Sequence, residues 1–299
     1  MVKTIMKLRK DRFLITYLFR NPLQLFGIIY FFIAIILALI GPIIIPNSPT
    51  TPNPTARLLP PSSKYWFGTD VNGMCVFSRT IYAFRTDLII SLTGALLAMF
   101  IGAPIGVFAG FFDGRKGISG FFSSLILRIM DVIQAFPIFV LGLLLVAGLG
   151  PSYLNIILLI CITNLPSNLR LARSEVLIIR EKTYIDAART AGNKATRIIF
   201  SHAMPNALTP VLALISVVMG FGILLTAGLS FVGAGIRVPT PEWGSMISIG
   251  APAILTGEWW AAFFPGAVMA ITIFSFSMTG EAITALMDPL ERVKLGFSQ

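Results

Sequence analysis

Long uncharged apolar runs are the feature of this sequence that most restricts how the chain can fold. A helix needs about 20 apolar residues to cross the roughly 30 Å hydrocarbon core of a bilayer. Residues 23–45 and 88–112 reach that length without a single charged side chain. Only 12% of the 299 residues are charged, about half the share in a typical soluble domain. The sequence therefore predicts an all-α integral membrane protein.

Four further apolar runs cover residues 118–149, 153–165, 207–231 and 259–283. The first of these carries Arg128 and Asp131 in its first half, and a helix of that whole length would extend about 48 Å. We therefore expect its uncharged part, residues 132–149, to cross the membrane and the two charged side chains to lie near one membrane face. The run that stops before Pro166 is the shortest. The sequence predicts six transmembrane helices in total.

Polar segments between the runs divide the chain into parts. The stretch after the first run is rich in Pro, Ser, Thr and Asn, which excludes a continuous helix there. A short basic and apolar stretch over residues 12–20 suits a helix that lies in the membrane interface. We expect, in order, a cytoplasmic tail with this interfacial helix (1–22), a first transmembrane helix (23–45), an extracytoplasmic loop (46–87), a five-helix core (88–284) that includes a cytoplasmic loop (174–206), and a C-terminal tail (285–299).

The Lys and Arg residues set the orientation of these spans. With six spans, the second and fourth connections lie on the same side as both termini, and that side holds 17 of the 23 Lys and Arg residues. Five lie on the other side, and Arg128 lies within a run. Since the richer side faces the cytoplasm, both termini are expected there. The net charge of +10 comes with no basic helix or aromatic-interleaved patch, so membrane lipid and not nucleic acid is the expected partner.

The cytoplasmic loop over residues 174–206 is polar but contains good helix formers. Its residues favour one helix that stops at Gly192 and a second helix over 194–202 that ends before Pro205. Small side chains allow another surface to approach closely at three positions, Ala187, Ala188 and Ala191. Two interpretations are equally open on these grounds: a knob that docks on a partner, and a structured loop that packs on its own bundle.

This loop resembles the EAA loop of ABC-importer permeases. The family pattern is Glu-Ala-Ala, three residues, Gly, nine residues, and then an apolar pair before Pro. Both spacings match here, because Asp186, Ala187 and Ala188 are followed by three residues and Gly192, and then by nine residues and the segment His202-Ala203-Met204-Pro205, with Tyr184 just upstream. Asp186 stands where the family has Glu, and it preserves the charge.

The rest of the chain is similar to the second permease subunit of dipeptide, oligopeptide and nickel importers over nearly its whole length. The segments that carry this resemblance are Arg20-Asn21-Pro22-Leu23, Phe67-Gly68-Thr69-Asp70, Asp131-Val132 with Ala135-Phe136-Pro137, 229–233 with Gly235, 239–244, and Asp288-Pro289. One departure is that Met74 and Cys75 replace the Arg-Asp pair of the family, ahead of Ser78 and Arg79. This departure indicates a changed local ion pair or substrate contact in an extracytoplasmic segment.

The resemblance implies a type I ABC-importer permease fold with cytoplasmic coupling helices. It implies that the loop around Asp186 docks on one of two cytoplasmic ATPase subunits, whose closure switches the spans between inward- and outward-facing states. It further implies a second, homologous permease subunit and an extracytoplasmic solute-binding protein, in a bacterial or archaeal cytoplasmic membrane. The coupling residues carried over are Tyr184, Asp186, Ala187, Ala188, Gly192 and Pro205. The extracytoplasmic motif residues are Gly68, Thr69, Asp70, Arg79, Trp243 and Gly244.

The sequence has no P-loop, so ATP and Mg are expected on the partner ATPase subunits. We expect no cofactor, no metal and no catalytic residue in this chain, which is predicted to be a permease and not an enzyme. The resemblance implies di- or oligopeptides as cargo, with nickel chelates, opines and oligosaccharides as alternatives within the family. An ATP-independent secondary transporter or channel is the alternative from another class, and the sequence has no clear inverted repeat to favour it.

Several charged and aromatic residues are candidates because of their positions. Arg128 and Asp131 are one helical turn apart, which predicts an ion pair between them near the cytoplasmic face. We expect three tryptophans at the membrane interface rather than against a ligand, namely Trp243, Trp259 and Trp260. Two segments are candidate surfaces for the solute-binding protein, residues 46–67 and 236–258, and the second carries Arg237 and Glu242 as expected surface charges.

Overall fold

The computed structural model of the protein describes residues 16–114 and 116–287, and the regular secondary structure of this part is helical. Six helices are long and apolar enough to cross a membrane. They are α2 (Pro22–Ile44), α3 (Val76–Phe111), α4 (Ile118–Ala135), α6 (Tyr153–Ile179), the continuous helix Ala195–Phe231 and α11 (Trp260–Met287). The predicted all-α fold class and the predicted number of spans are confirmed.

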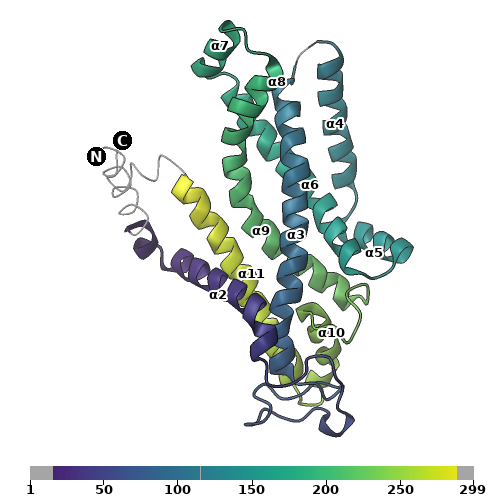
Figure 1. Ribbon diagram of the computed structural model, residues 1–299. Coiled ribbons are helices and arrows are strands. Elements are labelled where there is room, and N and C mark those ends of the chain that lie inside the picture. Colours follow the sequence, from purple (N-terminus) through teal and green to yellow (C-terminus); the bar gives the residue numbers. More distant parts are fainter. Residues whose placement is uncertain (1–15, 115, 288–299) are drawn as a thin grey trace.

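Shorter helices connect or flank these spans. The continuous helix consists of α8 (Ala195–Ile198), the π-helical turn η2 (Ile199–Ala203) and α9 (Met204–Phe231). The others are η1 (Pro54–Ala56), α5 (Ile138–Leu149), α7 (Thr183–Thr190) and α10 (Trp243–Ile254). α7 lies at the same end of the bundle as the start of α4, and α10 lies at the opposite end with the loop between α2 and α3 (Figure 1).

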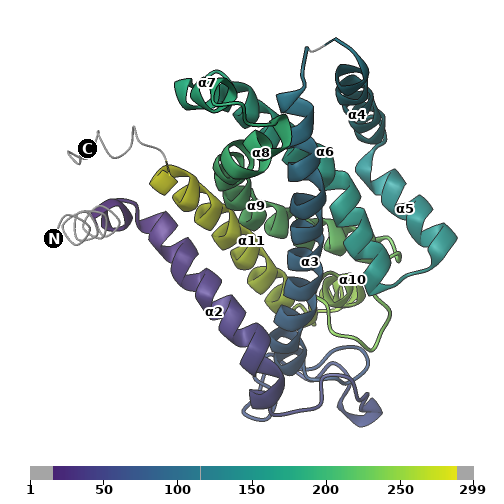
Figure 2. The ribbon, with the colours of Figure 1, turned by 45° about the horizontal axis from the view of Figure 1, so that its top comes forward.

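Three helices, α3, α6 and α9, form the centre of the bundle. α2 and α11 run side by side on one flank, and α4 and α5 lie on the other flank (Figures 1 and 2). Buried residues of the three central helices form one apolar cluster that includes Trp243 of α10. A second cluster of buried residues from the same helices includes Ile185 of α7. Both ends of the bundle are therefore packed onto the same three helices.

α3 is longer than the uncharged run that predicted it. The sequence predicts a loop over residues 46–87, but the helix begins at Val76 and continues to Phe111. Its first turns include Arg79 and Asp87, which interrupt the apolar pattern and are each only 1% exposed in the fold. The prediction fails here because contacts with distant segments bury these two charged residues. The sequence alone assigns charged residues to a polar loop.

The third run forms two helices instead of one. α4 ends at Ala135 and α5 begins at Ile138, because Phe136 before Pro137 adopts an extended conformation that ends the helix. The expected single span over residues 132–149 is therefore wrong. α4 is a candidate span by itself, and Arg128 and Asp131 lie in its second half.

The short run before Pro166 is part of a full-length helix. α6 continues through Pro166 to Ile179, so it is about 40 Å long. A proline inside a membrane helix is tolerated where neighbouring groups satisfy the freed backbone carbonyl, and Pro166 is a buried residue of α6. The fourth predicted span is thus a continuous helix, and the loop that follows it begins at residue 180 rather than at 174.

The two predicted terminal segments fall partly outside the described residues. Residues 16–20 of the predicted interfacial helix are helical, whereas residues 1–15 of the tail lie outside the described part. From residue 288 onward, the predicted C-terminal tail lies outside it as well, and so does the Asp288-Pro289 segment.

A stripe of glycines on α3 allows this helix to lie directly against α6. The stripe consists of Gly94, Gly102, Gly106 and Gly110. A Cβ atom on Gly106 would lie 2.2 Å from the Leu169 carbonyl oxygen, and one on Gly102 would lie 2.9 Å from the Leu165 carbonyl oxygen. Small residues at such contacts let helix backbones approach closely, which is a common way for membrane helices to associate.

Gly106→Val is expected to lower the free energy of unfolding by about 1–3 kcal/mol or more, because the branched side chain meets rigid backbone atoms of α6. The measurement is the thermal unfolding midpoint of the purified protein in detergent. Gly148→Val on α5 is the matched control, since a Cβ atom there meets nothing within 4 Å. Equal midpoints for the two variants would contradict the direct packing of α3 on α6.

Candidate functional site

The segment that resembles the EAA loop forms a knob at one end of the bundle, residues 183–192 (the α7 knob; Figure 1). Its exposed residues include four of the six predicted coupling residues, Tyr184, Asp186, Ala187 and Gly192. Ala188 is buried instead and packs inward together with Ile185. The knob therefore has a buried inner face that anchors it and an exposed outer face.

Gly192 fixes the end of α7. Its φ of +76° is a left-handed conformation that glycine adopts readily. The backbone and side-chain N–H groups of Asn193 both donate to the Ala188 carbonyl oxygen, at 3.2 and 3.0 Å. On the outer face, the Arg189 guanidinium donates to the Asp186 carboxylate at 3.0 Å. The shape of the knob is thus defined by local hydrogen bonds.

Two arginines connect α6 to the end of α3 next to the α7 knob. Arg180, directly after α6, donates to the carbonyl oxygens of Gly110 and Asp113 at 3.1 and 3.0 Å. Arg173 pairs with the Asp113 carboxylate at 3.1 Å. The base of the knob is therefore joined to both central helices.

Pro205 does not end the second helix of this loop, contrary to the prediction. The helix continues from α8 through the π-helical turn into α9, and Pro205 lies in the first turn of α9. Irregular hydrogen bonding at a π-helical turn is a setting in which a helix accommodates a proline. His202 of this turn lies close to the knob, with its ring centroid 6.4 Å from that of Tyr184.

At the opposite end of the bundle, Asp70 and Arg79 of the predicted motif lie together. One oxygen of Asp70, Oδ1, accepts the backbone N–H groups of Asn72 and Met74 at 2.8 and 2.9 Å. The other oxygen, Oδ2, lies 3.5 Å from Arg79 Nε. Asp70 therefore shapes its own turn and also ties the turn to α3.

Arg79 is the centre of this cluster and is 1% exposed. Its Nη1 atom donates to the carbonyl oxygens of Pro49 and Pro239 at 2.7 and 3.0 Å. The same atom lies 3.1 Å from the sulfur of Met74, the residue that stands where the family has arginine. The departure from the family pattern thus supplies an acceptor to Arg79, and the ion pair between Arg79 and Asp70 is present.

Gly68 and Thr69 join the same segment to its neighbours. Gly68 has a φ of +71°, and a Cβ atom on it would lie 2.6 Å from the Leu59 carbonyl oxygen. Thr69 donates its hydroxyl to the Ala56 carbonyl oxygen, and its own carbonyl accepts the indole N–H of Trp260 at 3.2 Å. These contacts fix the loop between α2 and α3 against α11.

Glu242 is buried, although the sequence predicts a surface charge. Only 1% of the residue is exposed, and its carboxylate caps the start of α10. It accepts the backbone N–H groups of Gly244 and Ser245 at 2.6 and 2.7 Å and the Ser230 hydroxyl at 2.6 Å. The expectation is wrong because a polar residue directly before a helix satisfies backbone donors that are otherwise free.

Trp243 is completely buried, so its expected position at the membrane interface is also wrong. Its backbone N–H donates to the Asp87 carboxylate, and its indole N–H donates to the Thr80 carbonyl oxygen, both at 3.1 Å. Its ring packs edge-on against Phe84. A Cβ atom on the following Gly244 would lie 2.3 Å from Ala227 Cα. This motif therefore fastens α10 to α3 and α9.

Two buried carboxyl groups thus flank the Trp243 backbone, and of these the sequence singled out only Glu242, as a surface charge. Burial raises the pKa of Glu242 above its ordinary value, and the hydrogen bonds from Ser230, Ser245 and Gly244 partly oppose that shift. Asp87 accepts the Trp243 N–H through Oδ2, whereas its Oδ1 has no hydrogen-bond partner among the described residues. The capping role of Glu242 could be predicted from its position directly before a helix, but no neighbouring residue in the sequence indicates that Asp87 is buried.

Asp131 pairs with Arg170 of α6 and not with Arg128, which corrects the predicted ion pair. The Arg170 guanidinium lies 2.6 Å from Asp131 Oδ1 and also donates to the Gln134 side chain. Among the described residues, no ion pair includes Arg128. The paired side chains are 43% and 66% exposed in this chain, so the pair contributes little stability here.

Comparison with known families accounts for most of the chain. Residues 102–293 match the family described as binding-protein-dependent transport system inner membrane component. Residues 14–61 match the N-terminal transmembrane domain of oligopeptide transport permease C. The first match includes the α7 knob and α10, and the second ends within the loop between α2 and α3.

Curated relatives align over nearly the full length. The chain is 35% identical to the probable D,D-dipeptide transport system permease protein of Escherichia coli K12, over 90% of this chain and 88% of that protein. It is 36% identical to the dipeptide permease of Alkalihalophilus pseudofirmus and 33% identical to the oligopeptide permease of Bacillus subtilis, in each case over 90% of this chain and 86% of the relative. The chain therefore belongs to the family of inner membrane components of binding-protein-dependent transport systems, as a multi-pass permease of the inner membrane.

Proposed function

We propose that this chain is a permease subunit of an ATP-driven importer of di- and oligopeptides. The observation that carries this proposal is the similarity over 90% of the chain to dipeptide and oligopeptide permeases. One copy forms half of the translocation pathway, and a second, homologous permease forms the other half. An extracytoplasmic solute-binding protein delivers the peptide to this pair.

The α7 knob is the proposed contact with the ATPase. Its outer face offers a carboxylate at Asp186 beside the small side chain of Ala187, which allows close approach of a partner surface. Two ATPase subunits bind and hydrolyse ATP with Mg, one beneath each permease. Because Arg180 and Arg173 join the base of the knob to the end of α3, a displacement of the knob moves α3 and α6 together as a rigid body.

The proposed orientation places the α7 knob in the cytoplasm of a bacterial or archaeal cell. The start of α2 and the end of α11 point toward the same end of the bundle as α7, in agreement with cytoplasmic termini (Figure 1). Seven of the 23 Lys and Arg residues lie in residues 170–197, around the knob, as expected for a cytoplasmic segment. α10 and the loop between α2 and α3 then face the solute-binding protein.

Reconstitution tests this function directly. We expect proteoliposomes that contain this chain, the second permease and the ATPase subunits to take up radiolabelled trialanine when ATP is enclosed and the binding protein is added outside. Omission of this chain or of ATP should reduce uptake to background. Uptake by this chain alone without ATPase subunits would identify an ATP-independent transporter or channel. A cognate binding protein that binds nickel chelates, opines or oligosaccharides but no peptide would refute the peptide cargo.

A further inference from the structure

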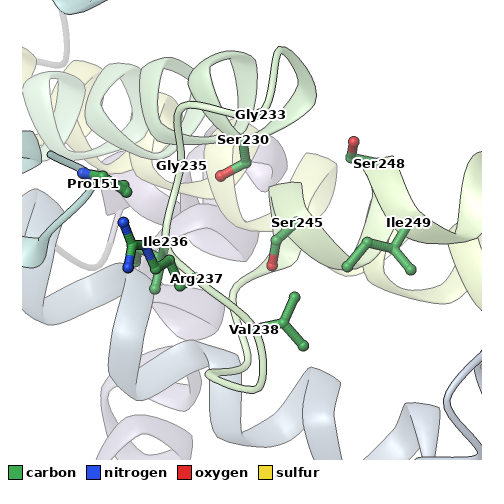
Figure 3. A pocket seen from close by; sticks show the side chains of 10 residues that line it. All are labelled: Pro151, Ser230, Gly233, Gly235, Ile236, Arg237, Val238, Ser245, Ser248 and Ile249. Atoms are coloured by element: carbon green, nitrogen blue, oxygen red, sulfur yellow. The ribbon is translucent and has the colours of Figure 1, made fainter. Parts of the chain in front are cut away.

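An open pocket of about 610 Å³ lies between the segment that follows α9 and the first turns of α10. Gly233 and residues 235–238 form one wall, and Ser245, Ser248 and Ile249 of α10 form another, with Pro151 at the edge (Figure 3). Figure 3 shows Arg237 beside Pro151 on one side of this space, and Ser248 and Ile249 on the other. α10, which supplies one wall of the pocket, lies at the end of the bundle opposite the α7 knob (Figure 1).

Arg237 brings an uncompensated positive charge to this pocket. It is exposed, and none of the ion pairs or side-chain hydrogen bonds of the described residues includes its guanidinium group. The nearest acid in sequence, Glu242, is buried behind the pocket, and its oxygens are occupied by Ser230, Gly244 and Ser245. The charge of Arg237 is therefore available to an anionic ligand.

The backbone beside Arg237 adds further donors. Within the described part of the chain, no hydrogen bond uses the backbone N–H groups of Gly235, Ile236, Arg237 or Val238. Gly235 and Ile236 are buried residues, and buried backbone donors are almost always paired with some acceptor. A run of unpaired backbone N–H groups beside an arginine is a typical arrangement for the capture of a carboxylate.

The same segment is held firmly against its neighbours. A Cβ atom on Gly235 would lie 1.9 Å from Ser230 Oγ, so the backbone of the segment rests directly on the end of α9. Ser230 and Ser245 line the pocket and are both bonded to Glu242. The hydrogen bonds of Glu242 therefore fix the two walls of the pocket relative to each other before any ligand binds.

We propose that this pocket binds the C-terminal carboxylate of the transported peptide, with Arg237 as its counter-charge and the N–H groups of residues 235–238 as hydrogen-bond donors. The inference rests on the proposed peptide import. A transporter that accepts peptides of many sequences must recognise groups that all of them share, and the terminal carboxylate is the shared group that an arginine pairs with in bidentate geometry. The pocket receives it on the side where the binding protein delivers.

The proposal is tested in the complete reconstituted complex by removing the charge of Arg237 and the charge of the peptide carboxylate, separately and together. Uptake of trialanine and of trialanine amide is measured with wild-type protein, Arg237→Gln and Arg237→Lys, with the same binding protein throughout. Any preference of the binding protein is then the same for every variant and cancels from the comparison. We expect Arg237→Gln to lower trialanine uptake about tenfold but to leave uptake of the amide nearly unchanged. Arg237→Lys keeps the charge but not the bidentate pair of donors, so its trialanine uptake should lie between those of wild type and Arg237→Gln.

Lys64→Gln is the matched control, because it removes one exposed positive charge at the same end of the bundle but outside the pocket. It should leave both uptake rates unchanged. Equal losses for the two peptides in Arg237→Gln would mean that Arg237 meets a carboxylate of a protein partner, and would overturn the proposal. So would wild-type uptake of both peptides by Arg237→Gln. If the wild-type complex transported neither peptide, the proposed function itself would fail along with the inference.

Discussion

Asp186→Arg is expected to abolish ATP-driven uptake while the protein remains folded and inserted. The Asp186 side chain is 63% exposed on the α7 knob, so within this chain the change removes only a surface ion pair with Arg189, worth about 1 kcal/mol or less. In a docked interface, an arginine in place of the carboxylate leaves charges buried without partners, which costs about 2–5 kcal/mol. Uptake should therefore fall on the order of a hundredfold, because each 1.4 kcal/mol corresponds to a factor of about ten.

The measurement is the initial rate of trialanine uptake into proteoliposomes, with membrane insertion checked in parallel. Glu181→Arg is the matched control, since it makes the same charge reversal at a side chain that is 76% exposed and lies just before α7. A substitution at Gly192 separates docking from folding less well, because the φ of +76° already disfavours any side chain there. Normal uptake by Asp186→Arg, or an equal loss in Glu181→Arg, would contradict docking through the outer face of the knob.

The outline of the fold was predictable because a bilayer imposes both a length and a composition on each span. The first run, residues 23–45, differs from α2 by only one residue at each end. The last run, residues 259–283, already includes Glu281 and ends just before the polar Thr284, whereas α11 continues to Met287. The length of an apolar run therefore predicts the bounds of a helix well when the helix has few buried polar residues beyond that run.

The first turns of α3 show why the same reasoning failed elsewhere. Arg79 and Asp87 look like loop residues when only their neighbours in sequence are considered. Their partners are distant in the chain: Arg79 donates to Pro239, and Asp87 accepts from Trp243. A charged residue can belong to a membrane helix when such contacts replace water, and a single sequence does not contain that information.

The charged residues of α4 illustrate a related limit. Spacing along one helix predicts that Asp131 pairs with Arg128, three residues earlier. The fold pairs Asp131 with Arg170 of α6 instead, and both α4 residues lie in a helix that ends before Pro137. Helical spacing predicts ion pairs only between residues of the same helix. It contains no information about partners on neighbouring helices.

The sequence identified the motif of the α7 knob, but it did not show which residues of the motif face the bundle and which are exposed. The resemblance identified Ala187 and Ala188 together as coupling residues. The fold separates them, because Ile185 and Ala188 are three residues apart and share the inner face, whereas Ala187 is on the outer face. In the proposed docking, Ala188 would therefore act by anchoring the knob, and Ala187 and its exposed neighbours would contact the ATPase.

Glu242→Ala is expected to cause a large loss of stability at the end of the bundle opposite the knob. The substitution leaves the Ser230 hydroxyl and the N–H groups of Gly244 and Ser245 without their acceptor in a buried site. Each buried donor without a partner costs about 1–3 kcal/mol, and the desolvation of the carboxylate is recovered, so we expect a net loss of about 3 kcal/mol. The thermal unfolding midpoint in detergent should fall accordingly.

Glu242→Gln shows whether the two carboxylate oxygens, as hydrogen-bond acceptors, are responsible for the stability. Glutamine has nearly the same shape, but its amide supplies only one oxygen, and its NH2 group faces at least one of the three donors that now bond to the carboxylate. We expect a loss between those of wild type and Glu242→Ala. Glu258→Ala, which removes an acid bonded to Thr256 just after α10, is the matched control and should unfold like wild type. If Glu242→Ala unfolds at the same temperature as Glu258→Ala, the carboxylate is not what fastens α10 to α9.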